Sequence, residues 1–375
     1  MALSTIGTNQ IASGAVTVPK VADQVLTNRN LVKNGAMIVA QRAASATGLG
    51  AANGYFTVDR MRMAIGDASA GRFTMAQTAV TDLSGFSKSV KISCTTADTS
   101  IAAGERLVLN YRFEGQDLQS LKSSSSSLKA FTVSFYARAN AAFNLCSEII
   151  FGADTSKNSQ ANQINALTTD WQRFTMSIPA ATNTQIDDVT THDTDLMLWM
   201  HAGSTYTSGS TSTTLRPNVN ANRAAGVSSI FASTSNFIEI TGIQLEVGVA
   251  TPFEHEELST TLAKCQRYFI DCKSQGSGYG GVAMFRSVYA NQAEGYTGFP
   301  VEMRATPTVT LFDGSSNTGA LTENGAAHNR GCAAGNISKV GFNKATSDGT
   351  GTGHFSTSAG AGSALLGTYQ AAAEL

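Results

Sequence analysis

The chain has 375 residues, of which 42% are hydrophobic and 14% charged, and its formal net charge at pH 7 is -1. This length exceeds a single ordinary core and predicts two or three domains. Because the charge is nearly balanced, the chain lacks the excess of Lys and Arg that binds a nucleic-acid backbone, and we expect no nucleic-acid partner. Ser, Thr, Ala and Gly take the place of charged residues, a composition common in β-rich proteins.

Residues 1–29 are short pieces rich in Thr, Ala and Val, too small to bury a core of their own. They form either an arm that neighbouring proteins order or a loose tail. The segment lacks the apolar region of a signal peptide, and no run in the chain approaches the roughly 18 apolar residues of a membrane helix. We therefore expect no membrane insertion.

Residues 30–255 alternate between apolar and polar positions in short runs separated by Gly, Ser and Asn. Such period-two runs are typical of strands with one buried face, so we expect an all-β domain, an antiparallel jelly-roll-like β-sandwich. Segment 30–42 would be its first strand and 237–247 its last, in adjacent positions. A helical turn is expected at 116–121. The core-facing sets are Val90, Ile92 and Cys94; Leu107, Leu109, Tyr111 and Phe113; Phe131, Val133, Phe135 and Ala137; Phe174, Met176 and Ile178; and Leu196, Leu198 and Met200.

The last of these strands changes its apolar phase. Ile238 and Ile240 lie on one face, but the pattern then moves to Ile243, Leu245 and Val247. Both sets can face one core only if a bulge takes up an extra residue, and Gly242 is the residue that tolerates it.

After Pro252 the apolar period becomes helical, and we expect a connecting helix over 256–273. The apolar seam is too short for a free coiled coil, so it packs either on the chain's own domains or on copies of the chain. In the second case the interface residues would be Leu258, Leu262, Cys265, Phe269 and Cys272.

Residues 274–375 form a separate distal β-rich region, with candidate strands at 282–289, 296–303, 309–312, 338–342 and 365–369. Gly- and Ser-rich stretches separate them. Long loops on short strands suit a variable binding tip, and they equally suit a loosely packed β domain.

Most motifs of catalysis and cofactor binding are missing. Gly276, Gly278 and Gly281 have the GxGxxG spacing, but a helix precedes them and a strand follows, the reverse of a dinucleotide site. The five Cys residues include no CxxC pair and predict free thiols. The acidic cluster at 187–195 lacks the calcium-loop pattern, so we interpret it as a solvated loop. We expect no catalytic group, no metal and no cofactor.

Sugar binding would need exposed aromatic rings that stack on pyranose faces. Trp199 alternates with the core-facing Leu198 and Met200, so its ring faces away from them; alternatively, it packs under a loop or at a subunit interface. Tyr279 and Tyr296 belong to the distal region and are candidates only if that region is the binding tip. The candidate sugar-binding residues are Trp199, Tyr206, Trp171, Tyr279 and Tyr296.

Four stretches carry a family resemblance: NLVKNGAMIVAQR at 30–42, QLEVGVATPFE at 244–254, LAKCQRYF at 262–269 and FPVEMRATPTVTL at 299–311. In these stretches the chain resembles bacteriophage tail-fibre and receptor-binding structural proteins. The resemblance implies a carbohydrate-binding-module-like sandwich, a short helix and a distal β domain. It also implies a homotrimer made in the host cytoplasm and placed in the virion as a tail appendage, with residues 1–29 attached to tail proteins and the β domains contacting host surface glycans.

Two other particle roles compete with this interpretation. A capsid decoration protein or head fibre fits the same composition. A tailspike depolymerase would place two carboxylates in a groove, usually on a longer β-helical body. Here the 27 acidic residues are thinly spread and no long repeat exists, so we expect no enzymatic activity.

Overall fold

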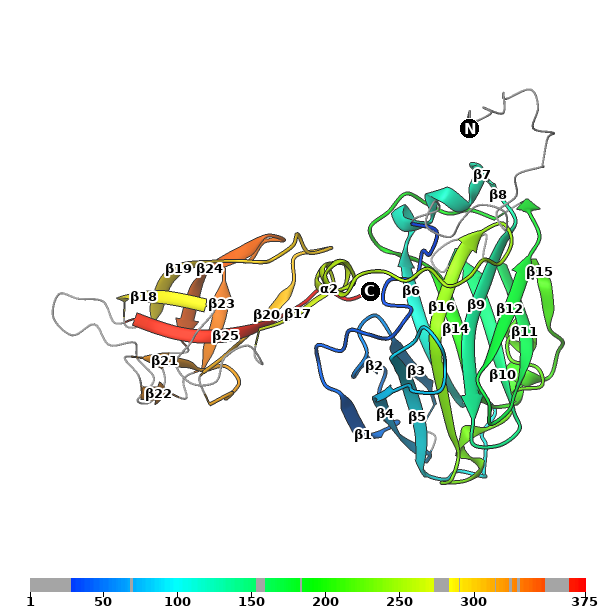
Figure 1. Ribbon diagram of the computed structural model, residues 1–375. Helices are drawn as coiled ribbons and strands as arrows, with labels where there is room; N and C mark the ends of the chain where they lie inside the picture. Colours follow the sequence, from blue (N-terminus) through cyan, green and yellow to red (C-terminus); the bar gives the residue numbers. More distant parts are fainter. Residues whose placement is uncertain are drawn as a thin grey trace, which may run out of the picture.

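The computed structural model describes residues 28–67, 70–152, 159–182, 184–272, 283–289, 291–313, 315–323, 326–328, 331–347 and 364–375. Two β-rich bodies lie side by side, joined through α2 (Leu258–Gln266) and the segment that ends at the C-terminus (Figure 1). No helix in the described ranges is long and apolar enough to cross a membrane.

The larger body is a sandwich of two antiparallel sheets, which confirms the predicted all-β, jelly-roll-like fold. One sheet has six strands in the order β1 (Ser45–Leu49), β4 (Arg72–Ala79), β5 (Lys88–Thr96), β16 (Phe237–Val247), β9 (Phe131–Ala139) and β12 (Gln172–Ile178). The other has seven, in the order β15 (Ser212–Pro217), β11 (Ser159–Leu167), β10 (Phe143–Phe151), β14 (His192–Ala202), β6 (Arg106–Glu114), β3 (Arg62–Gly66) and β2 (Gly54–Tyr55).

Smaller elements close the ends of the sandwich. A 3₁₀ helix, η4 (Gly115–Leu121), confirms the expected helical turn, and a small sheet follows it, made of β7 (Lys122–Ser124), β8 (Ser127–Leu128) and β13 (Ala181–Thr182). Between β14 and β16 the chain forms α1 (Ser204–Thr207), η5 (Asn220–Asn222) and η6 (Ile230–Ala232). This stretch bears on the candidate site because it covers part of the seven-stranded sheet.

The sandwich core forms where the two sheets face each other. Every predicted core-facing residue is buried there except Phe174, which is half-buried. The alternation sets this outcome, because one face of each strand turns inward. All five Cys residues are free, as predicted, and four of them are buried.

Segment 30–42 is not the first strand. Leu31 donates its backbone N–H to Leu245 at 2.9 Å and Gly35 accepts from Ile243 at 3.0 Å, so the segment does run beside β16. Asn34 and Met37 adopt positive φ angles of 61° and 59°, which break a strand into turns. The first regular strand, β1, lies at the far edge of its sheet, so it is not adjacent to the last.

The predicted bulge in β16 is present. Thr241 pairs with Tyr136 and Gln244 with Ser134 across β9, so β16 holds one more residue than its partner. Gly242 takes φ +61°, in the left-handed region that favours glycine. Ile243 and Leu245 are buried on the same core as Ile238 and Ile240, whereas Val247, expected in the same set, is 40% exposed because it is the last residue of the strand.

The connecting helix is shorter than the expected 256–273. It ends at Gln266, and Phe269 belongs to a strand, β17 (Phe269–Asp271). The expected helical seam therefore does not continue to Phe269 and Cys272. Cys265 and Phe269 are covered by their own chain, whereas Leu258 is 59% exposed.

The distal body is one nine-stranded arrangement organised on β25 (Ala364–Ala372). The order β22-β21-β25-β18-β19-β24-β23 has two additional strands, β17 and β20, that also pair with β25. Its strands are β18 (Ala283–Tyr289), β19 (Gln292–Gly298), β20 (Thr308–Phe312), β21 (Leu321–Glu323), β22 (Ala326–His328), β23 (Cys332–Gly335) and β24 (Gly341–Ser347). The strands expected at 296–303 and 338–342 were displaced by several residues, since Gly-rich turns obscure the alternation there.

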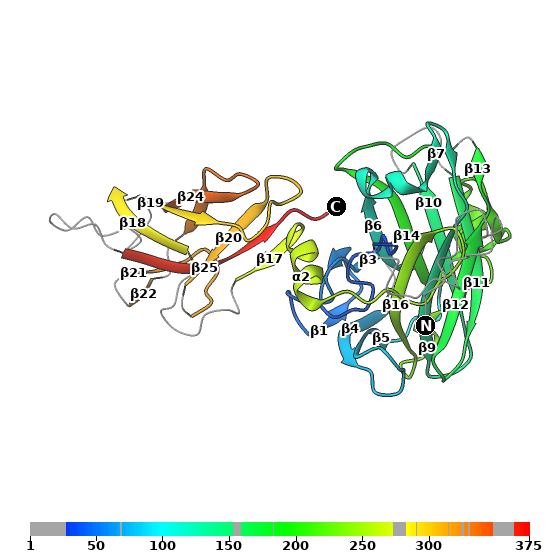
Figure 2. The same ribbon diagram turned by 45° about the horizontal axis from the view of Figure 1, so that its top comes forward.

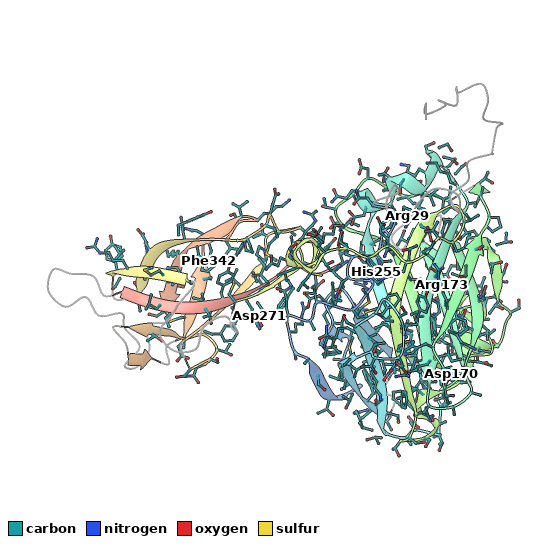
Figure 3. All side chains as sticks on the ribbon, in the orientation of Figure 1. Arg29, Asp170, Arg173, His255, Asp271 and Phe342 are labelled. Atoms are coloured by element: carbon teal, nitrogen blue, oxygen red, sulfur yellow. The ribbon has the colours of Figure 1, made fainter. Side chains whose placement is uncertain are left out.

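The two bodies meet through buried charges. The Arg60 guanidinium, 1% exposed, donates to Glu374 at 2.8 Å and lies 3.5 Å from the ring centroid of Tyr268. Glu374 also accepts from Arg42 at 3.0 Å. Figure 2 shows the C-terminus at this junction, beside the sandwich. In Figure 3 Phe342 lies within the distal body and Asp271 at the connection.

Candidate functional site

The candidate site lies on the outer face of the seven-stranded sheet, where β3, β6 and β14 are neighbours. Leu107 and Leu109 of β6 face the core, so the alternate residues of that strand face outward. The register sets Arg62 opposite Asn110, and Val108 opposite Trp199. Three strands thus bring polar and apolar side chains from distant parts of the chain onto one surface.

A pocket of about 200 Å³ opens on this face. Ala64 on β3 is its smallest lining residue, and longer side chains come from β3 itself, from β6 and from β14. The lining residues are Asn53, Arg62, Ala64, Arg106, Val108, Asn110, Arg112, Met197, Trp199 and Arg223. Four of these ten residues are arginines, and none is acidic.

Trp199 is held rigidly beneath the pocket. Its indole Nε1 donates to Glu148 Oε2 at 2.8 Å, its ring lies 5.2 Å from that of Tyr206, and the Arg223 guanidinium lies 4.9 Å from its centroid. Arg223 also donates to Glu148 from Nε and Nη2, each at 3.1 Å. Glu148 thus holds both the indole and the guanidinium in place, and the stack serves as a rigid base.

The arginines of the pocket are only partly balanced by acids. Arg223 pairs with Glu148, and Arg112 Nε lies 3.7 Å from Asp195 Oδ1. Arg106 donates to the neutral hydroxyl of Tyr206 at 2.7 Å. Within the described ranges neither Arg106 nor Arg62 forms an ion pair. Burial lowers the pKa of Arg62, and the nearby charge of Arg112 lowers it further.

Two buried polar atoms in the pocket lining have no partner within the described part of the chain. Asn110 is 1% exposed, and its amide donates to Asp195 at 2.9 Å, but its Oδ1 accepts no hydrogen bond. Arg112 Nε likewise has no hydrogen-bond acceptor. A buried unsatisfied polar atom costs roughly 1–3 kcal/mol. Both atoms belong to residues that line the pocket, and both have hydrogen-bonding capacity that the described part of the chain leaves unused.

A second, larger hollow of about 300 Å³ lies between residues 28–38 and 253–264. Its polar groups are occupied: Glu254 accepts from the backbone N–H groups of Arg29 and Asn30, and Glu256 pairs with Lys264. None of its lining residues, all in the described ranges, has a buried polar atom without a partner. This difference favours the smaller, arginine-lined pocket as the candidate site.

Two carboxylates lie near the pocket without lining it. Glu148 is fully buried under Trp199 and Arg223. His192 Nε2 lies 3.0 Å from Asp195 Oδ1. Burial would raise the pKa of Asp195, but the adjacent His192 outweighs this effect and holds that pKa below its usual range. Both carboxylates have internal partners, and neither lines the pocket.

Only the first half of the acidic cluster 187–195 is the solvated loop expected from its sequence: residues 187–191 precede β14, and Asp188 is exposed. Asp193 and Asp195 are buried within β14, because the alternation of that strand continues through them. No group of three potential ligands that could hold a metal occurs within the described ranges.

The structure brings two of the five sugar-binding candidates together. Trp199 and Tyr206 are in contact, but Trp199 is 0% and Tyr206 8% exposed. The expectation of an exposed Trp199 ring was wrong; its ring packs under covering side chains, the alternative considered from the sequence. Trp171 bonds to Asp82 at 3.0 Å beside the six-stranded sheet. Tyr296 is 72% exposed on β19, and Tyr279 lies outside the described residues.

Sequence reasoning missed the arginines that define the pocket. A signal was present in the β6 stretch RLVLNYRFE, where the outward positions carry Arg106, Asn110 and Arg112. In a chain with 14% charged residues, long cations at alternate positions of one strand are unusual. Arg62 and Arg223 could not be added to that set, because only the sheet register and the covering stretch after β15 place them there.

No protein-family model matches this chain, and no curated protein matches it. The chain is similar to a family 11 carbohydrate-binding module of a Clostridium thermocellum cellulase at 9% identity, over 56% of this chain and 99% of the other, with a TM-score of 0.28. A putative sugar-binding protein of Bacteroides thetaiotaomicron aligns at 11% identity over 59% and 100%, with a TM-score of 0.28.

The chain is also similar to the enzymatically active domain of tailspike protein 4 of bacteriophage CBA120. The identity is 8%, the TM-score is 0.30, and the match covers 58% of this chain but only 21% of the other. At these TM-scores the likenesses carry no argument about function, which is drawn instead from the pocket.

Proposed function

We propose that this chain is a non-enzymatic structural protein of a bacteriophage particle, a tail fibre or related appendage, whose sandwich binds a host surface glycan in the arginine-lined pocket. The observation that supports glycan binding is the pocket itself: a preformed hollow on a rigid sheet, lined by four arginines and by Asn110, whose Oδ1 accepts no hydrogen bond in the described part of the chain. Concave sites with a few convergent polar groups are the usual form of small-ligand sites.

The particle assignment rests on the resemblance of residues 30–42, 244–254, 262–269 and 299–311 to tail-fibre proteins. In this proposal residues 1–29 attach the chain to other tail proteins. Three copies associate, partly through α2, where Leu258 is exposed and Leu262 half-buried. Presentation of three weak sugar sites on one particle raises the overall avidity.

The glycan part is tested by blocking the pocket without changing its charge. Ala64→Trp places a large side chain in a 200 Å³ hollow and should abolish binding of the intact chain to an array of bacterial surface polysaccharides. Ala333→Trp, at an exposed position of the distal body, is the matched control and should bind as the parent does. Equal binding by both variants, with unchanged circular dichroism, would remove the pocket from the proposal.

The particle part is tested separately. Gold-labelled antibody against the chain should mark the tail of the particle in electron micrographs, and light scattering should give the mass of three chains. Label on the head would support the decoration or head-fibre alternative. A single-chain mass at micromolar concentration would refute the trimer. If the chain is trimeric, Leu258→Glu should weaken the association, since it places a charge at the exposed end of α2.

A further inference from the structure

We infer that the sugar unit held in the pocket is acidic, with a carboxylate, phosphate or sulfate group that the arginines bind. This inference rests on the proposed function and specifies its ligand. Its basis is the chemistry of the walls: the pocket has four arginines and no acidic residue, and Arg62 and Arg106 have no ion-pair partner in the described ranges.

Placing these arginines close together costs free energy in the protein without a ligand. Arg106 and Arg112 are on β6, and Arg62 is on the adjacent β3, so like charges share one face of neighbouring strands. Arg112 lies diagonally across from Arg62, and its charge lowers the pKa of Arg62, so these two cations repel each other. Glu148 balances Arg223 and Asp195 balances Arg112, but Arg62 and Arg106 have no ion-pair partner in the described ranges. A local arrangement that opposes stability in this way is expected at functional sites. An anion in the pocket would supply the missing compensation.

The arginine side chain suits this role better than a general positive charge would. Its planar guanidinium donates in a fork that matches carboxylate, phosphate and sulfate oxygens. Arg223 is already fixed by Glu148 and Arg106 by Tyr206. These groups therefore lose little side-chain freedom when a ligand arrives, which favours binding.

The pocket is built for a sugar that carries the anion, in preference to a bare anion. Asn110 Oδ1 is an acceptor and would repel an anionic oxygen, but it can accept a hydrogen bond from a sugar hydroxyl. The volume of about 200 Å³ lies below the usual range for drug-sized ligands, roughly 300–1,000 Å³, and suits one sugar unit. Neutral sugars favour exposed aromatic platforms, whereas Trp199 is fully buried here.

The experiment uses an array on which each acidic glycan is paired with a neutral counterpart. Uronic-acid glycans are paired with their methyl esters, phosphorylated glycans with their dephosphorylated forms, and sulfated glycans with their desulfated forms. Single-stranded DNA is included as a non-sugar polyanion. We expect the intact chain to bind one acidic class at least tenfold more tightly than its neutral counterpart, and the class that binds identifies the anion.

Substitution then connects the preference to the pocket. Arg62→Gln should weaken binding of the acidic glycan by roughly tenfold to a hundredfold, a much larger factor than for its neutral counterpart. Arg286→Gln, at an exposed position of β18, is the matched control and should alter neither.

The outcomes separate the two proposals. Equal binding of acidic and neutral partners, or an acidic preference that Arg62→Gln leaves intact, overturns the inference and preserves glycan binding. Tighter binding of DNA than of any glycan overturns the inference in favour of a phosphate-backbone site. Binding to no glycan at all overturns the proposed function as well.

Discussion

Replacing Gly242 with alanine should destabilise the sandwich more than the same change at any unhindered glycine. Gly242 forms the bulge that lets both apolar phases of β16 face one core. Its φ of +61° disfavours any residue with a Cβ. A Cβ built there would also lie 2.8 Å from Phe86 Cζ and 2.8 Å from Tyr136 Cδ2, closer than packed carbon atoms approach.

The magnitude follows from these two terms. The left-handed conformation costs roughly 1–2 kcal/mol for a residue with a Cβ. Forcing a methyl group against two packed rings costs about 1–3 kcal/mol. Gly242→Ala should therefore lower the free energy of unfolding by roughly 2–5 kcal/mol. In a domain of this size that corresponds to a decrease in Tm of roughly 4–20 °C.

The matched control is Gly248→Ala. Gly248 also has a positive φ, +84°, but nothing lies within 4 Å of an added Cβ. Gly248→Ala should therefore lower the free energy of unfolding only by the cost of the left-handed backbone conformation, roughly 1–2 kcal/mol. Urea unfolding of both variants measures the difference. Equal decreases in the free energy of unfolding would show that the rings of Phe86 and Tyr136 move aside without cost. No decrease in either variant would refute the reasoning from backbone strain.

Two further predictions concern the junction. Burial raises the pKa of the Asp59 carboxyl group to about 6 from an ordinary 3.8, so the folded state binds the proton of Asp59 more tightly than the unfolded state does. The stability that the protonated carboxyl group contributes is therefore full below about pH 4 and is lost as the pH rises through 6. Between pH 4 and 7 the stability of Asp59→Asn relative to the parent should therefore rise by roughly 2–3 kcal/mol, measured by urea unfolding; a flat difference would refute it. Glu374→Ala leaves Arg60 buried without its carboxylate and should cost roughly 3 kcal/mol, at the low end for a buried pair because Glu374 is 13% exposed. Small-angle scattering should then show a looser arrangement of the two bodies, whereas an unchanged profile would show that other contacts hold them.

The alternation of apolar residues determined the sandwich. Apolar residues, among them Val133 and Leu109, occupy every second position of their strands, and a strand must turn one face inward to bury them. The bulge was also determined locally, because the phase shift after Ile240 and the adjacent Gly242 leave few ways to keep one core. These features depend on neighbours within about ten residues.

Two elements predicted from local sequence patterns differ in the structure. A helix extending from 256 to 273 was expected because apolar residues recur at helical spacing, but the chain leaves the helix at Gln266 so that Phe269 can pair with β25. Edge pairing with a strand about 100 residues away outweighs local spacing. Asn34 and Met37 likewise turn a predicted strand into a series of turns.

The pocket depended on tertiary structure alone. Which residues oppose one another across β3, β6 and β14 is set by strand order and register, and neither is readable from one strand's pattern. Trp199 faces away from the main core, as its alternation indicated, yet it is buried because the chain after β14 folds back over it and brings Arg223 onto its ring. Periodicity specifies the side of a sheet on which a residue lies; what covers that side is decided by segments that meet only when the chain is folded.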